Sequence, residues 1–65
     1  MMKQYFLQFD FWNRDINKFF FGVIDADLNE TPLPEVCRQI IRDNFTGINP
    51  YDVEIKINAF NNIEI

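Results

Sequence analysis

The sequence contains no histidine and no serine, and its single cysteine is Cys37. The lack of histidine excludes imidazole metal sites and the Cys-His pair, and the lack of serine excludes the Ser-His-Asp triad. A single cysteine cannot form a disulfide within the chain, so stability must come from apolar packing or from a partner. Most hydrolytic chemistry is therefore removed, and we expect a protein that is not an enzyme.

Basic residues and long apolar runs are also scarce. Six Lys and Arg stand against ten Asp and Glu, a formal net charge of -4, whereas nucleic-acid binding requires Lys and Arg that neutralise phosphates. Gln4, Gln8 and Asp10 interrupt the apolar residues near the N-terminus, and no stretch reaches the roughly 20 apolar residues that span a bilayer. We therefore expect a cytoplasmic protein that contacts neither nucleic acid nor a membrane.

The residues that are present predict one folded domain over residues 1–65. Apolar residues make up 48 % of the chain and aromatic residues 17 %, far from the composition of a disordered protein. Residues 4–12 alternate in the period of a strand, and residues 18–26 form a second apolar run. The polar residues 13–17 between them are typical of a turn, so the two runs predict a β-hairpin.

A helix and a third strand are expected to follow. Pro34 fits the first turn of a helix over residues 34–45, and Gly47 and Pro50 oppose its continuation. Residues 53–59 alternate as a third strand, with a bulge or turn at residues 61–62. The apolar positions of the helix fall on one stripe, made of Val36, Cys37, Ile40, Ile41 and Phe45.

These elements predict an α+β fold of order β-β-α-β. The simplest arrangement is a three-stranded antiparallel sheet in the order 2-1-3, with the helix packed on one face. The order 1-2-3, in which the helix joins two parallel strands, is the alternative.

One helix covers one face of such a sheet, yet both faces carry aromatic residues. If Trp12 lies opposite Lys18, the second face carries Phe6, Trp12, Phe20 and Ile24, which we take as the expected interaction site. If Trp12 lies opposite Asn17, Phe19, Phe21 and Val23 replace the last two. Either set exceeds the few hundred Å² that a soluble monomer usually leaves exposed in one patch.

Such a patch requires a cover. Residues 60–65 or the loop at residues 25–31 could fold under the sheet, the sheet could twist strongly enough to enclose the patch, or a second molecule could pack there. Small domains often gain stability by oligomerisation. We expect a protein-binding module that forms a homodimer or caps a partner through this face.

The acidic residues offer an alternative. Asp25, Asp27, Glu30 and Glu35 could form an acidic surface that mimics nucleic acid and blocks a basic protein. Asp25, Asp27 and Asn29 also match the start of a calcium loop, but Glu30 occupies the position of its glycine and Val36 that of its bidentate glutamate. We therefore expect neither a metal nor a cofactor.

The order of elements also carries a resemblance. Small uncharacterised β-β-α-β proteins of phages and prophages resemble this chain in the aromatic hairpin, the Thr31-Pro32-Leu33-Pro34-Glu35 helix start, the helix with Ile40-Ile41 and the strand at residues 53–57. The resemblance covers most of the chain, but no functional residue can be carried over from it. It implies an accessory role without catalysis, such as interference with a host protein.

Overall fold

The computed structural model describes residues 1–63, which form three strands and one helix. Strands β1 (Lys3–Trp12) and β2 (Asn17–Ala26) form a hairpin, helix α1 (Leu33–Asn44) follows, and strand β3 (Glu54–Asn62) comes last. β1 pairs with β2 on one side and with β3 on the other, both antiparallel, so the sheet order is β2-β1-β3. The α+β fold and the strand order predicted from the sequence are confirmed.

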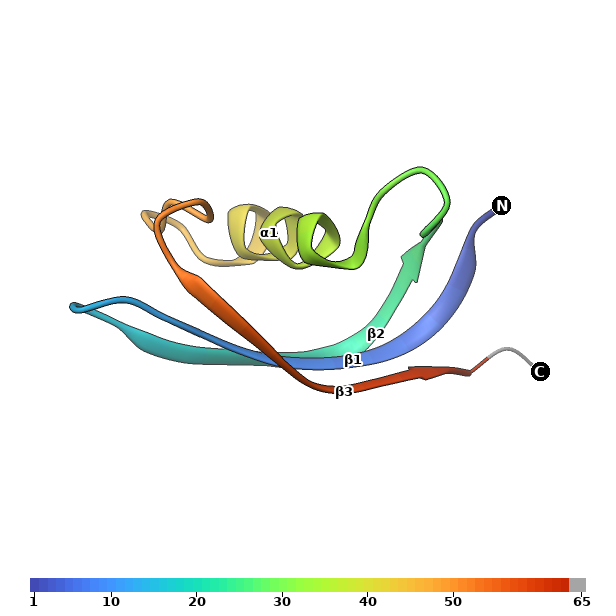
Figure 1. The fold of residues 1–65 in the computed structure, drawn as a ribbon, viewed down its shortest axis with the longest axis horizontal. Coiled ribbons are helices and arrows are strands. Elements are labelled where there is room, and N and C mark those ends of the chain that lie inside the picture. The colour runs from blue at the N-terminus through green and yellow to red at the C-terminus, as the bar shows by residue number, and fades with distance from the viewer. Residues whose placement is uncertain (64–65) are drawn as a thin grey trace.

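The molecule has two layers. Helix α1 and the connections on either side of it lie above one face of the curved sheet, and no helix lies on the other side of the described chain (Figure 1). We call these the covered face and the open face. The covered face holds the core, which contains Leu7, Phe9 and Phe11 from β1 and Cys37 and Ile41 from α1, all fully buried.

The alternation of β1 explains this division. Its odd-numbered residues Tyr5, Leu7, Phe9 and Phe11 are buried, while the even-numbered residues between them are only partly buried. Burying a large apolar side chain contributes about 1.5 to 3 kcal/mol, so the central strand supplies the largest share of the core. The apolar stripe of α1 meets this row from above, as its sequence pattern predicts.

The hairpin register places Trp12 opposite Asn17. The side chain of Asn13 fixes the connection, because its Oδ1 accepts hydrogen bonds from the backbone N–H groups of Asp15 at 2.8 Å and Ile16 at 3.0 Å. Residues 13–16 therefore form a tight turn of the kind that Asn side chains stabilise.

This register corrects part of the expected site. Phe20 lies opposite Phe9 and Ile24 lies opposite Tyr5, so both point to the covered face and pack against the core. The expectation that Phe20 and Ile24 belong to the exposed patch is wrong, because a shift of one residue in the register turns every side chain to the other face.

Strand β3 contains its irregularity earlier than expected. The pairing with β1 shifts between Gln8 and Phe9, where the partners change from Ala59 to Ile57 and leave Asn58 as the extra residue. A bulge reverses the alternation beyond it, so Phe60 turns toward the covered face and stacks on Tyr5, with ring centroids 4.7 Å apart. The bulge expected at residues 61–62 lies at Asn58 instead, and Asn61 and Asn62 continue the strand.

Candidate protein interface

The most exposed large apolar side chains of the sheet form a row on the open face of β2. Phe19, Phe21 and Val23 are 58 %, 62 % and 59 % exposed. The Phe19 and Phe21 rings stack on each other with centroids 6.0 Å apart and an interplanar angle of 8°. We call these three residues the β2 row.

The neighbouring strand contributes less to the open face. Phe6 and Trp12 of β1 lie on this face as predicted, opposite Val23 and Asn17, but both are partly buried. Between them stand Gln8 and Asp10, so the middle of the open face is polar. The exposed apolar surface therefore lies at the margin of the sheet rather than at its centre.

The two free edges of the sheet differ strongly. The β3 edge carries Glu54, Lys56 and the bulge at Asn58, which are devices that discourage pairing with another strand. The β2 edge has no proline, no bulge and no charge between Lys18 and Asp25. A long apolar edge strand of this kind is a favourable template for strand addition.

The backbone of β2 is oriented toward this edge at the same residues. The N–H of Asn13 donates to the carbonyl of Ile16 at 3.0 Å, which makes residues 13 and 16 a hydrogen-bonded pair. Hydrogen-bonded and non-hydrogen-bonded pairs alternate along an antiparallel ladder. Even-numbered residues of β2 therefore bond to β1, and the backbone groups of Phe19, Phe21 and Val23 face the free edge.

Three of the four acidic residues singled out from the sequence line one hollow, and the fourth, Glu35, contacts Tyr51. Asp25, Asp27 and Glu30 line a shallow hollow of about 130 Å³ together with Met2 and Gln39. Glu35 lies on α1 and accepts a hydrogen bond of 2.6 Å from the hydroxyl of Tyr51, which raises the pKa of that phenol.

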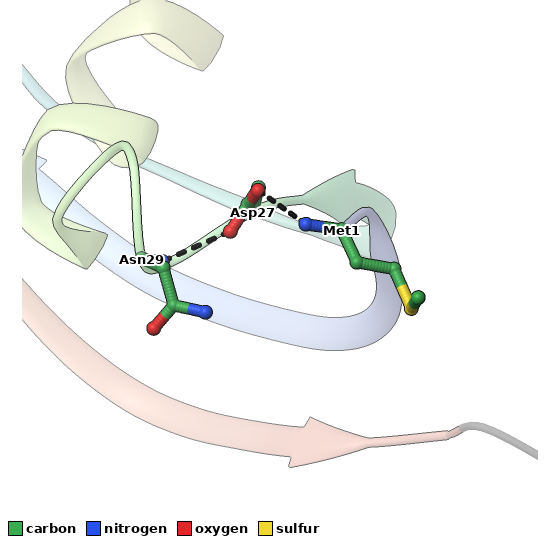
Figure 2. A network of polar contacts seen from close by, with 3 residues as sticks. All are labelled: Met1, Asp27 and Asn29. Atoms are coloured by element: carbon green, nitrogen blue, oxygen red, sulfur yellow. Dashed lines mark hydrogen bonds and ion pairs between the residues drawn. The ribbon is translucent and has the colours of Figure 1, made fainter.

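Asp27 is engaged by two groups of the chain (Figure 2). Its Oδ2 receives a hydrogen bond from the Met1 ammonium group at 2.5 Å, and its Oδ1 accepts one from the backbone N–H of Asn29 at 3.0 Å. The Met1 ammonium, followed by the Asn29 backbone, holds the pKa of Asp27 below its usual value. This carboxylate therefore closes the loop after β2, and it is not a free acidic group.

Cys37 is enclosed by the core. Its side chain is fully buried, and burial raises the pKa of the thiol to about 11. A thiol with a raised pKa is a poor nucleophile because little thiolate is present at neutral pH. Residues 1–63 also hold no group of three side chains that could bind a metal ion, and no helix there is long and apolar enough to cross a membrane.

The fold defines a small α+β protein whose distinctive surface is the β2 row. The chain matches no protein-family model, and neither a curated protein nor a solved structure is significantly similar to it. The surface itself must therefore support any functional conclusion.

Sequence reasoning placed Phe6 and Trp12 on this face but chose the register that excludes Phe19, Phe21 and Val23. The signal for the observed register, in which Trp12 lies opposite Asn17, was the turn-forming residue Asn13.

Proposed function

We propose that this protein is a non-catalytic protein-interaction module that self-associates through the apolar residues of its open face. The observation that carries the proposal is the exposure of the β2 row, three large apolar side chains side by side at about 60 %. Water contact with such a row is unfavourable by roughly 25 cal/mol per Å², which a partner relieves. An accessory role in a phage or prophage, as the resemblance implies, forms part of the same proposal.

The size of the protein supports self-association. A domain of this length has a net stability of only about 3 to 10 kcal/mol, and a second copy adds apolar burial without a second gene product. The acidic-inhibitor alternative has less support, because Asp27 and Glu35 are already engaged within the chain.

Sedimentation velocity over a range of concentrations tests the proposal. We expect a reversible monomer–dimer equilibrium, and the double variant Phe19→Ser/Phe21→Ser should weaken it by at least about tenfold. The matched control is Tyr51→Ser, which removes an aromatic ring of similar exposure, 65 %, outside the sheet. A wild type that stays monomeric up to about 1 mM, where a contact of about 4 kcal/mol would be detected, contradicts the proposal.

A further inference from the structure

The contact area distinguishes a face-on contact from an edge contact. With roughly 200 Å² for a fully buried Phe, the β2 row exposes on the order of 300 Å² of apolar surface. A standard interface buries about 800 Å² per partner, of which more than half is apolar. The row is too small for that, and the polar centre of the open face at Gln8 and Asp10 does not extend it.

An edge contact uses the same residues more fully. At Phe19, Phe21 and Val23 the side chains are exposed, and the backbone N–H and carbonyl groups face the free edge. A strand added there pairs these backbone groups and covers the side chains laterally at the same time. The β3 edge offers no equivalent, because of its charges and its bulge.

We infer that β2 pairs antiparallel with β2 of a second copy, about a two-fold axis at Phe21, to form a continuous six-stranded sheet. The inference rests on the proposed function and names its partner and its geometry. Directly opposed residues of antiparallel strands lie on the same face, so the axis must pass through a residue rather than between two. Phe21 and Gly22 are the two residues at the middle of the strand.

The side chains select Phe21. With the axis at Phe21, the open-face residues are matched, because Phe19 faces Val23 of the second copy and Asn17 faces its Asp25. On the covered face, Lys18 faces Ile24 in this register. With the axis at Gly22, Phe19 would face the charged Asp25 instead.

On the covered face, the axis at Phe21 places Phe20 opposite Gly22 of the second copy. Within each chain the Phe20 ring already lies over Gly22, 3.4 Å from where a Cβ would be, so the glycine and the ring pack together at the centre of the proposed interface. An aromatic residue opposite a glycine is a recognised stabilising pair in sheets.

Single-cysteine crosslinking tests the register. In Phe21→Cys the two introduced cysteines lie opposite each other in a hydrogen-bonded pair with Cα atoms about 5.5 Å apart, within disulfide range. In the controls Phe19→Cys and Val23→Cys, the equivalent cysteines of the two copies lie about 14 Å apart, four residues out of step. We expect a disulfide-linked dimer from Phe21→Cys on mild oxidation, and at least about tenfold less from either control. The native Cys37 is buried and lies outside the proposed interface.

A charge exchange provides a second measurement that does not depend on oxidation. Phe19→Lys and Val23→Glu should each weaken association alone, whereas an equimolar mixture brings the lysine and the glutamate directly opposite each other. We expect the mixture to associate about fivefold or more tightly than either variant. Circular dichroism of each variant confirms that the sheet has formed.

The outcomes separate the two proposals. A wild type that associates without a preferential crosslink at position 21, or without rescue on mixing, overturns the edge pairing and leaves the interaction module standing. A wild type that remains monomeric overturns both.

Discussion

The two faces of the sheet are built from similar residues but differ in how far those residues are buried. On the covered face, Phe9 is fully buried between Phe11 and Phe20, with ring centroids 5.8 and 5.6 Å away. On the open face, Phe21 touches Phe19 and otherwise leaves 62 % of its surface in water. Phenylalanine content alone therefore does not define a core. The role of each ring depends on whether α1 reaches it.

The largest effect should separate these two rings. Phe9→Ala is expected to lower the free energy of unfolding by about 3 to 5 kcal/mol, because it removes a buried ring and leaves a cavity. This loss is comparable to the total stability of a chain of this length. Phe21→Ala should cost about 1 kcal/mol or less in the monomer.

Urea unfolding at a concentration below dimer formation measures both. Equal losses from the two variants would show that the open face also contributes to the core of the monomer, contrary to the comparison.

The reactivity of thiols on the two faces should differ by an intermediate amount. At a concentration below dimer formation, Cys37 should react with a thiol reagent at neutral pH only as fast as the protein opens, whereas the cysteine of Val23→Cys reacts as an exposed thiol. Rapid labelling of Cys37 in the folded wild type would contradict its place in the buried layer.

The same thiol predicts a loss of stability in alkali. Its pKa is about 11 in the folded protein and about 8.5 in an unfolded chain, so the folded state holds the proton more tightly. The contribution is fully present below about pH 8.5 and is lost as the pH rises to 11, with a slope of up to about 1.4 kcal/mol per pH unit. Urea unfolding of wild type and Cys37→Ala across this range measures it, and equal slopes would argue against the buried thiol as the cause.

The smallest effect is expected at Asp27, on the loop that leads from β2 toward the helix. Its lowered pKa means that its contribution is present above about pH 3.9 and is lost as the pH falls through the folded value. Asp27→Asn should lower the melting temperature slightly at pH 7, and the difference from wild type should close in acid. A difference that persists below that range would assign the effect to the side-chain amide rather than to the charge.

Much of the fold could be predicted from the sequence because β1 and α1 obey one periodicity each. The odd-numbered residues of β1 and the stripe of α1 that includes Cys37 and Ile41 were placed correctly. The register of β2 could not be decided by periodicity, since Phe19, Phe20 and Phe21 make both of its faces apolar. Because of this ambiguity, the expected interaction site included Phe20 and Ile24 in place of Phe19, Phe21 and Val23.

The bulge was misplaced for a related reason. Asn58, Asn61 and Asn62 are equally suited to an irregular position, and a bulge at Asn58 is the one that turns Phe60 onto Tyr5 and the core.

The four-residue turn that Asn13 closes has a consequence beyond the hairpin itself. Because both faces of β2 are apolar, hydrophobicity alone is also compatible with the opposite orientation of this strand, in which Phe20 is exposed and Phe21 is buried. The length of this turn therefore determines which of the two hairpin registers forms. Lengthening it by one amino acid would interchange which phenylalanines meet the solvent without altering the composition of the strand.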